Sequence, residues 1–320
     1  MHETPPAPGH PRTPRSGLIL GLGAYLLWGV LPLYFPLLRP AGPAEIIAHR
    51  IVWSLAFCAL VLIVTRTWGT YTAALRDRRT LGTLSVAGAL IAVNWLTYVF
   101  GVLNGHTVDT ALGYYINPLV TVALAVVVLG ERLRPMQWAA LGTGACAVVV
   151  ITLGMGRLPW IALILAASFG LYGLIKNRVG RTVTALASLA VETTVLSPVA
   201  LAYLLWLATT GTAAFGQHGA GHMAALGAAG VVTAVPLLMF GGAARRLPLS
   251  VVGMLQYLAP TLQFILGLAV FHEAMPAARW WGFGLVWLAL VILTTDGLRN
   301  SRSVGLRRGA VRAATVPARP

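Results

Sequence analysis

The chain repeats itself at a spacing of 142 residues. The segment Tyr115-Ile116-Asn117-Pro118 has a counterpart in Tyr257-Leu258-Ala259-Pro260. The same spacing carries two further pairs onto each other, Glu131 onto Glu273 and Trp138 onto Trp280. Each of these landmarks lies inside or beside a long apolar run. Four matches in one register indicate an internal duplication, and a membrane chain built from two such halves usually binds its ligand where the halves meet.

The composition requires a lipid environment. Hydrophobic residues make up 58% of the chain and charged residues only 10%, whereas a soluble domain carries about 25% charged residues. The net charge of +15 first suggests a nucleic-acid partner. However, the basic residues form short caps between apolar runs, without an interleaved polar face, which excludes that partner. Cys58 and Cys146 lie in apolar runs without metal-ligand spacing, so we expect free thiols.

The apolar runs predict an all-α integral membrane protein. At about 20 residues per crossing, we count ten transmembrane helices, at 17–37, 43–65, 80–103, 107–129, 136–154, 158–176, 184–209, 222–243, 248–272 and 277–296. The first is not a signal peptide, because further spans follow it. The spans form two five-helix repeats, 17–154 and 158–296. The flanking segments 1–16 and 297–320 are expected to be disordered tails, the second one basic.

The distribution of arginines predicts that both termini are cytoplasmic. With this orientation, 19 of the 23 basic residues fall in cytoplasmic segments, in agreement with the positive-inside rule. Arg39, Arg157 and Arg279 fall outside, and Arg50 lies within a span. We expect the basic cytoplasmic side to face anionic lipids.

Two further matches extend the duplication. Residues 24–29 align with residues 168–173 at a spacing of 144, which places the first span over the sixth. Asn94 and Tyr98 of the third span fall within the eighth span at the 142-residue spacing. Because five spans are an odd number, the second half must enter the membrane from the opposite side. The repeat is therefore predicted to be inverted, as in alternating-access carriers.

Pro118 and Pro260 lie near the middles of two equivalent spans. Each removes a backbone donor and crowds the carbonyl four residues earlier, so each is expected to kink its helix. In lipid the freed carbonyl needs a partner or a wet cavity. A packing kink without a ligand is the alternative. The polar neighbours of the two prolines favour a cavity: Tyr114, Tyr115, Asn117, Gln256, Tyr257 and Gln263.

The second span carries three ionisable residues, Glu45, His49 and Arg50. Exposure of such groups to lipid would cost several kcal/mol each, so we expect them to face a cavity. Glu45 and His49 share a helix face and form a candidate protonatable pair. Arg50 is a candidate anchor for an anionic or polarised ligand. The alternative is that Glu45 marks the outer end of the helix and Arg50 binds a neighbouring carbonyl.

Glu192 in the seventh span is the matching acidic residue of the second half. It either titrates during function or accepts a hydrogen bond from Arg50. We predict one polar pocket near the midplane, between the halves, that binds a substrate or a coupling ion, with Asn117 and Glu192 as further candidates. The residues expected to converge there are Glu45, His49, Arg50, Asn94, Tyr98, Tyr115, Gln256 and Tyr257.

The remaining acidic residues of the spans are expected to be structural. Asp109 is placed to cap the N-terminus of the fourth span. Glu131 and Glu273 lie where the fifth and tenth spans begin, at the positive ends of the helix dipoles. His272-Glu273 begins like a zinc-protease motif, but Pro276 stands where the second ligand would be. The sequence therefore indicates no catalytic, metal or cofactor site.

Several stretches together form a specific pattern: Ala44–Ser54, Asn94-Trp95, Leu112–Leu119, Gly130-Glu131-Arg132 with Met136-Gln137-Trp138, Gln256-Tyr257 and Pro260-Thr261. This pattern resembles the RarD proteins, in the EamA group of the drug/metabolite transporter superfamily. The resemblance covers roughly residues 17–296. It implies a ten-span inverted-repeat carrier of the bacterial cytoplasmic membrane. Asp109-Thr110-Ala111 departs from the Glu-Ala-Ser usual in the group, which argues against a coupling role for that acid.

Three functions fit these observations. The favoured one is a secondary transporter, exporter or importer, of a small organic metabolite or drug-like compound. The second is a lipid or amphiphile scramblase, which would need a polar groove open to the bilayer. The third is an intramembrane enzyme, for which Glu45 and His49 are the only hint of a catalytic pair.

Overall fold

The computed structural model describes residues 15–130, 132–179 and 182–314. Within these ranges the regular secondary structure is entirely helical, and ten of the helices are long and apolar enough to cross a membrane. Each predicted span overlaps one of these ten helices. The chain is therefore an all-α integral membrane protein, as the apolar runs predict.

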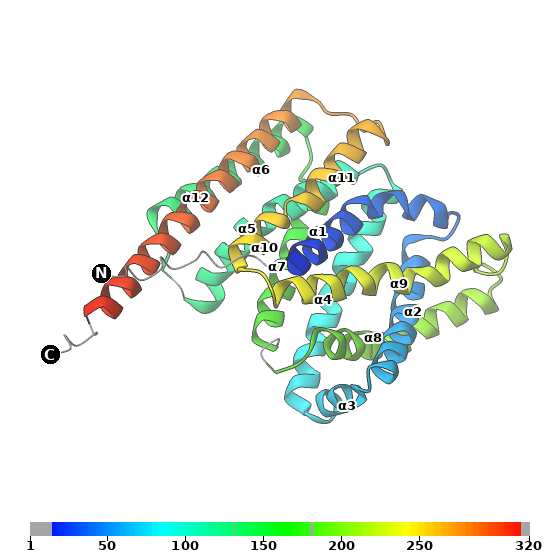
Figure 1. Ribbon diagram of the computed structural model, residues 1–320. Helices are drawn as coiled ribbons and strands as arrows, with labels where there is room; N and C mark the ends of the chain where they lie inside the picture. The colour runs from blue at the N-terminus through cyan, green and yellow to red at the C-terminus, as the bar shows by residue number, and fades with distance from the viewer. Residues whose placement is uncertain (1–14, 131, 180–181, 315–320) are drawn as a thin grey trace.

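The first half contains six α-helices joined by short loops (Figure 1). In chain order they are α1 (Arg15–Val30), α2 (Pro43–Val64), α3 (Trp68–Arg76), α4 (Arg78–Leu103), α5 (Thr107–Leu129) and α6 (Pro135–Met155). Two short 3-10 helices, η1 (Leu31–Leu33) and η2 (Phe35–Leu38), continue α1. They replace α-helix because each carries a proline, Pro32 or Pro36, near its start.

The second half contains six further helices. They are α7 (Trp160–Val179), α8 (Ala185–Thr209), α9 (Gly219–Ala244), α10 (Leu249–Leu255), α11 (Leu258–Ala269) and α12 (Ala277–Ala314). α10 and α11 are the two parts of the predicted ninth span. The interruption falls at Gln256 and Tyr257, directly before Pro260, because a proline removes the hydrogen bond to the carbonyl four residues earlier. In contrast, α5 runs through Pro118 as one helix.

The short helix α3 lies between the second and third spans and was not predicted. Its nine residues are too few to cross a membrane, and Thr70, Thr72 and Arg76 interrupt the apolar residues, so it forms no long apolar run. Asp77 separates α3 from α4 and caps α4, because its carboxylate accepts hydrogen bonds from the N–H groups of Arg79 and Thr80. Hydrogen bonds from the hydroxyl and the N–H of Thr80 hold the pKa of Asp77 below its ordinary value.

The last helix is longer than the sequence indicates. α12 continues to Ala314, into the segment for which a disordered tail was predicted from residue 297 onward. Arginine and alanine, which are good helix formers, are the commonest residues of this segment, and no proline occurs in it before Pro317. The predicted tail at 1–16 lies almost entirely outside the described residues.

The helix starts and the helix packing follow the internal repeat. α2, α5 and α6 begin at Pro43, Thr107 and Pro135, and α8, α10 and α12 begin 142 residues later, at Ala185, Leu249 and Ala277. α1 packs on α9 and α11, and its counterpart α7 packs on α4 and α5. Equivalent helices also pack on each other, α2 on α8, α5 on α11 and α6 on α12. The equivalent helices α1 and α7 thus pack on equivalent pairs of helices, which supports a two-repeat architecture. The inverted orientation of the repeats stays a prediction.

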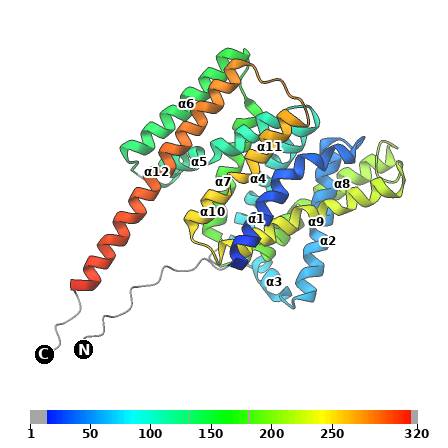
Figure 2. The same ribbon diagram turned by 45° about the horizontal axis from the view of Figure 1, so that its top comes forward.

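The two ends of the bundle are named here by the predicted orientation. The outer end is where α4 joins α5, and the inner end is where α3 joins α4. Figures 1 and 2 show α6 and α12 side by side at the edge of the bundle. Arg134 and Asp296 form an ion pair between these two helices at the inner end.

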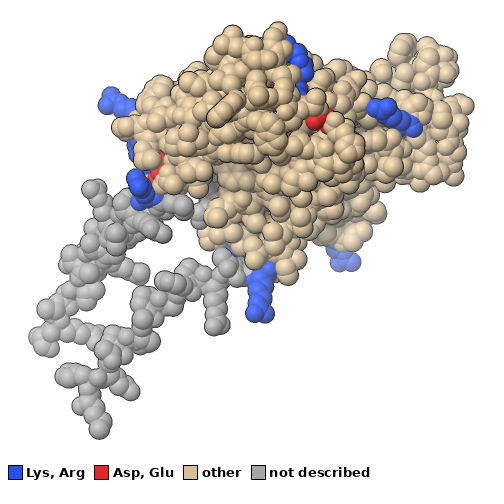
Figure 3. Space-filling view, turned by 90° about the horizontal axis from the view of Figure 1, so that it is seen from above, with Lys and Arg blue, Asp and Glu red and all other residues tan. Residues whose placement is uncertain are grey.

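The surface of the bundle suits a lipid environment. In Figure 3 most of the visible face is uncharged, and a small number of lysine and arginine side chains project from its margins. Large apolar side chains such as Ile19, Val127, Leu153 and Trp281 are exposed. Burying them in lipid removes the cost that water would impose.

A glycine allows α2 and α9 to pack backbone against backbone. A Cβ atom at Gly230 would overlap the backbone carbonyl of Trp53 and lie 2.6 Å from the amide nitrogen of Ser54. Neither group can give way without displacing α2. This contact holds α9 against the part of α2 that carries Arg50.

We expect Gly230→Ala to destabilise the protein by about 1–3 kcal/mol, because a methyl group is forced into a filled helix contact. Gly227→Ala is the matched control on the same helix, since its Cβ atom would meet only the Trp53 ring at 3.9 Å. The measurement is the melting temperature of each purified variant in detergent. Equal melting temperatures for the two variants would contradict this close approach.

Candidate functional site

Arg50 lies in a buried cluster that joins the two halves. Its Nε donates a hydrogen bond to Thr233 Oγ1 of α9 at 2.8 Å. Its guanidinium carbon lies 4.5 Å from the ring centre of Trp95 on α4 and 5.7 Å from that of Phe35 in η2. Arg50 is 5% exposed, and its Nη1 is buried without a hydrogen-bond partner among the described residues. Elements of both halves therefore enclose one cation.

Tyrosine and amide side chains extend this cluster towards α7. The rings of Tyr98 and Tyr114 meet edge to face with their centres 5.6 Å apart. The Tyr114 hydroxyl donates to Asn94 Oδ1 at 3.1 Å, and the Asn94 amide donates to the Ser168 hydroxyl at 3.0 Å. The Tyr98 hydroxyl is buried and makes no hydrogen bond within the described ranges. We name the following set the Arg50 cluster: Phe35, Arg50, Asn94, Trp95, Tyr98, Tyr114 and Thr233.

In the described part of the chain, no carboxylate forms an ion pair with Arg50. The ion pairs present there use other basic residues: His106, Arg134, Arg157, Lys176 and Arg279. Desolvating a guanidinium costs several kcal/mol. A cation–π contact is worth about 0.5–2 kcal/mol, and one hydrogen bond from a charged group about 1.5–3 kcal/mol. The cluster thus holds a cation whose burial is not fully balanced, which in membrane proteins marks a functional site.

Glu45 and His49 bind the loop between α8 and α9 at the outer end. The Glu45 carboxylate accepts hydrogen bonds from the N–H groups of Ala214 at 2.8 Å and Phe215 at 3.2 Å. The His49 ring stacks on Phe215 with the ring centres 4.7 Å apart. A surface pocket of about 490 Å³ is lined by Glu45 and by residues 211–214 of this loop. These contacts place both residues outside the Arg50 cluster.

Tyr115 and Tyr257 belong to a second core, formed mainly by α5, α6, α11 and α12. The Tyr115 hydroxyl hydrogen-bonds the Thr261 hydroxyl at 2.8 Å, and its ring packs on two aromatic rings of α12. Neighbouring helix residues point about 100° apart. Tyr114 therefore faces the Arg50 cluster, whereas Tyr115 faces α11 and α12.

Two other amide side chains that were predicted near a cavity lie apart from each other. Asn117 lies against Gly170 of α7, and its Oδ1 is buried without a hydrogen-bond partner among the described residues. Gln256 ends α10 at the interruption before Pro260. The predicted single pocket is therefore divided. Arg50, Asn94 and Tyr98 come together, and the other five residues of that prediction lie at the outer loop or in and beside the second core.

Glu192 on α8 is buried and fully paired. Its Oε1 accepts hydrogen bonds from Lys176 at 2.7 Å and from Ser188 at 3.0 Å, and its Oε2 accepts one from Tyr172 at 3.2 Å. The considered hydrogen bond from Arg50 to Glu192 is not observed, because Lys176 of α7 supplies a nearer cation. The role of Glu192 in titration stays a prediction.

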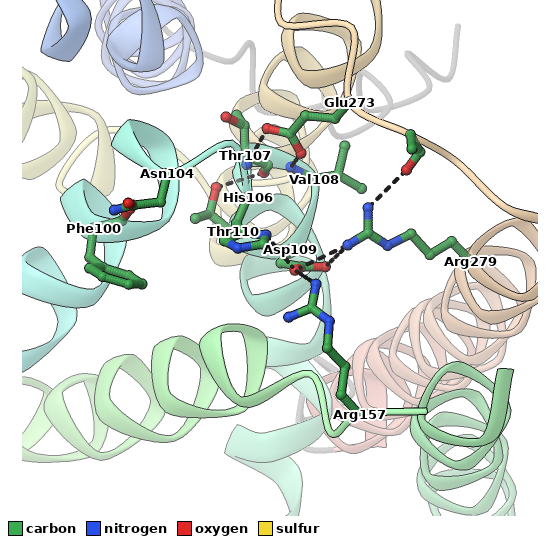
Figure 4. Close-up of polar contacts among 11 residues, drawn as sticks. Phe100, Asn104, His106, Thr107, Val108, Asp109, Thr110, Arg157, Glu273 and Arg279 are labelled. Atoms are coloured by element: carbon green, nitrogen blue, oxygen red, sulfur yellow. Dashed lines mark hydrogen bonds and ion pairs between the residues drawn. The ribbon is translucent and has the colours of Figure 1, made fainter. Parts of the chain in front are cut away.

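Glu273 joins the last loop to the start of α5 at the outer end (Figure 4). Its carboxylate accepts hydrogen bonds from the N–H groups of Thr107 at 2.5 Å and Val108 at 2.9 Å, the first two residues of α5. Glu273 was expected at the start of the tenth span. It serves a different helix because the loop folds back over the end of α11, where the Glu273 N–H donates to the Gly267 carbonyl.

Asp109 completes these contacts from the first turn of α5 (Figure 4). It accepts hydrogen bonds from Arg279 at 3.0 and 3.2 Å and pairs with Arg157 at 3.6 Å. The N-cap position is His106, so the prediction that Asp109 caps this helix is wrong. Two arginines converge on Asp109 instead. We name the contacts of Glu273 and Asp109 the outer clasp. Glu131, the repeat partner of Glu273, lies outside the described residues.

Several residues of these clusters were not predicted. Thr233 carries no charge, and its contact with Arg50 depends on the packing of α9 on α2, which the sequence does not indicate. Lys176 lies at the end of the sixth span and was counted only as a loop charge. Arg279 was likewise counted by its charge and not by its partner. For the described residues, no group of three or more His, Cys, Asp or Glu side chains could hold a metal ion.

Ten membrane-length helices around a buried, charge-bearing cluster define a multi-pass membrane protein. Residues 15–153 match the EamA-like transporter family. A solved crystal structure that is 21% identical shares the fold, with a TM-score of 0.56 over 87% of this chain and 96% of that chain.

Three curated relatives identify the group within that class. Protein RarD of Streptomyces exfoliatus is 53% identical over 306 residues, 96% of each chain. An uncharacterized transporter of Pseudomonas aeruginosa is 42% identical, over 90% of this chain and 96% of its own length. Protein RarD of Escherichia coli (strain K12) is 39% identical, over 90% of this chain and 97% of its own length. The chain belongs to the RarD proteins of the EamA-like transporter family, and it is a membrane transporter.

Proposed function

We propose that this protein is a secondary transporter that moves a small organic metabolite or drug-like compound across the membrane by alternating access. The observation that carries the proposal is the buried cation of Arg50, which has no ion-pair partner among the described residues and is held between η2, α2 and α4 of one half and α9 of the other. A ligand bound there would touch elements that move past each other when access alternates. Relatives that are named transporters support the proposal.

The closed setting of the Arg50 cluster favours a carrier over the alternatives. Arg50, Asn94 and Tyr98 are each at most 5% exposed, whereas a scramblase needs a polar groove open to lipid. An intramembrane enzyme would need Glu45 and His49 as a catalytic pair. The Glu45 carboxylate is occupied by two backbone N–H groups, which disfavours that role.

The outer clasp supports a mechanism for alternating access. Glu273 binds the first two residues of α5. At the internal spacing of 142 residues, Glu131 takes the place of Glu273, and Leu249 and Ser250 at the start of α10 take the place of those two residues. In the proposed mechanism Glu131 binds the start of α10 in the opposite state. The two carboxylates would then close the outer and inner ends in turn.

We place the protein in the bacterial cytoplasmic membrane with both termini on the cytoplasmic side. The four arginines around α3, Arg66, Arg76, Arg78 and Arg79, would then face anionic lipid headgroups. Alkaline phosphatase fused after residue 320 or within 65–67 is expected to be inactive. The same reporter within 210–218 is expected to be active. The reverse pattern would contradict the orientation.

Cysteine labelling tests the clasps. Ala111 is buried one turn into α5 from the outer clasp, so Ala111→Cys is a suitable reporter in a chain that carries Cys58→Ala and Cys146→Ser. Glu273→Gln is expected to raise its labelling rate by a membrane-impermeant maleimide about tenfold. The reason is that a hydrogen bond to a charged group is worth about 1.5–3 kcal/mol, and 1.4 kcal/mol corresponds to a factor of about ten.

Glu131 is the repeat partner of Glu273, and its substitution should have the opposite effect on the labelling rate of Ala111→Cys. Glu131→Gln is expected to slow the labelling of the same reporter, because it weakens the closure of the inner end. Asp77→Asn is the control, since Asp77 also accepts backbone N–H groups at a helix start but lies in the α3–α4 connection. If Glu131→Gln and Glu273→Gln change the rate in the same direction, the paired-clasp mechanism is wrong.

Flux in proteoliposomes tests the transport function itself. Vesicles loaded with a bacterial metabolite extract are expected to lose particular small organic compounds only when they contain the protein, as measured by mass spectrometry of the outer solution. A fluorescent-lipid flipping assay and a search for new reaction products on the same vesicles test the scramblase and the enzyme. Lipid flipping without metabolite flux would overturn the proposal.

Arg50 is expected to be required for this flux. Arg50→Ala should abolish it, and Arg50→Lys should restore little, because the planar guanidinium that stacks on Trp95 is lost. Arg39→Ala is the matched control at the outer end, where Arg39 is exposed and donates to a backbone carbonyl. Wild-type flux from a stable Arg50→Ala protein would refute the role of Arg50.

A further inference from the structure

We propose that the Arg50 cluster binds an organic monocarboxylate, a compound with one negative charge and an apolar or aromatic body, and that it excludes amino-acid zwitterions and cations. This inference names the substrate class of the site and rests on the proposed transport function.

Each acidic side chain that the structure describes is engaged away from Arg50. Glu45 binds the α8–α9 loop, Asp77 caps α4, Asp109 binds Arg279, Glu192 binds Lys176, Glu273 binds α5 and Asp296 binds Arg134. Glu3 and Glu131 lie outside the described ranges. Among the described residues, the ligand is therefore left to supply the negative charge.

The position equivalent to Arg50 in the other repeat also carries a charge, but that charge has partners within the protein. At the 142-residue spacing, Arg50 of α2 corresponds to Glu192 of α8. Glu192 receives a cation and two hydroxyl donors from within the protein. Arg50 receives one threonine hydroxyl and aromatic faces. The same scaffold position is thus internally neutralised in one half and left charged in the other.

The hydrogen-bond donors and acceptors of the Arg50 cluster also favour a carboxylate. Arg50 Nη1 and the Tyr98 hydroxyl are buried donors that lack partners among the described residues, and the Arg50 guanidinium and the Tyr98 ring both lie against the ring of Phe35. The two oxygens of one carboxylate can accept from both donors. The acceptor oxygen of Asn94 is already bound by Tyr114, and the cluster contains no carboxylate for an ammonium group. An amino-acid zwitterion would leave its cation unpaired.

The charge and shape of the cluster limit the anion further. The cluster holds one guanidinium, so a dicarboxylate or a phosphate monoester would bring a charge without a partner. The rings of Phe35, Trp95, Tyr98 and Tyr114 line the cluster. These faces suit a planar or apolar body attached to the carboxylate.

Protein stability without ligand is the first test. Arg50→Met removes a buried cation that has no counter-ion in the described structure, so the melting temperature in detergent should stay the same or rise. Lys176→Met is the matched variant in the other half. It leaves the buried Glu192 carboxylate without its cation, so the melting temperature should fall. An equal fall for both variants would show that Arg50 has a counter-ion within the protein, and the proposal would be overturned.

Ligand binding is the second test. The probes are benzoate, phenylacetate and indole-3-acetate, each compared with its neutral amide, and phenylalanine and tryptophan as zwitterions with the same aromatic bodies. At millimolar concentration at least one carboxylate should raise the melting temperature of the native protein by a few degrees. Its amide and the zwitterions should not, and Arg50→Met should lose the shift while Arg39→Ala keeps it.

The outcomes separate this inference from the proposed function. Metabolite flux together with equal shifts for a carboxylate and its amide would overturn the monocarboxylate assignment and leave transport standing. The absence of any carboxylate-selective shift across the three pairs would also overturn the assignment. An Arg50-dependent shift without flux of any compound would support the binding site and refute the transport function.

Discussion

A charge in the apolar layer needs a partner, and the arrangement of the helices depends on how this need is met. Glu192 and Lys176 join α8 to α7, Asp109 and Arg279 join α5 to α12, and Glu273 binds the N-terminus of α5. The contacts of Asp109 and Glu273 link elements that are distant in the sequence, and the contact of Glu192 links two consecutive helices. Because breaking such a pair would strand a charge at a cost of about 3–5 kcal/mol, these pairs disfavour arrangements in which the paired helices are not neighbours.

The duplicated scaffold makes the exception at Arg50 informative. Helix starts and helix neighbours repeat at the internal spacing, so the two halves offer similar positions to a buried charge. In the second half Glu192 is neutralised by nearby side chains. In the first half the contacts of the Arg50 guanidinium among the described residues are Thr233 and aromatic rings. Since the fold can satisfy a charge at this position, the charge at Arg50 does not follow from the architecture alone.

The sequence predicts the spans well because a membrane crossing is a property of one continuous segment. It also predicts that Arg50, Asn94 and Tyr98 face the interior, since polar groups avoid lipid. It fails where the answer depends on a second segment. Tyr115 follows Tyr114 but faces another core, and the loop that carries Glu273 folds back onto α5. Charge counting identified the basic residues, but their partners emerged only from the packing.

The position of Arg50 explains how ligand binding can affect the helix arrangement. Its guanidinium is shared between Thr233 of α9 and the aromatic rings of α4 and η2, and α9 meets α2 backbone to backbone at Gly230. An anion that binds Nη1 would draw charge away from the hydrogen bond to Thr233. The bond that is weakened joins the two halves. Under the proposed mechanism, neutralisation of this buried cation and relative movement of the repeats would be coupled through the same side chain.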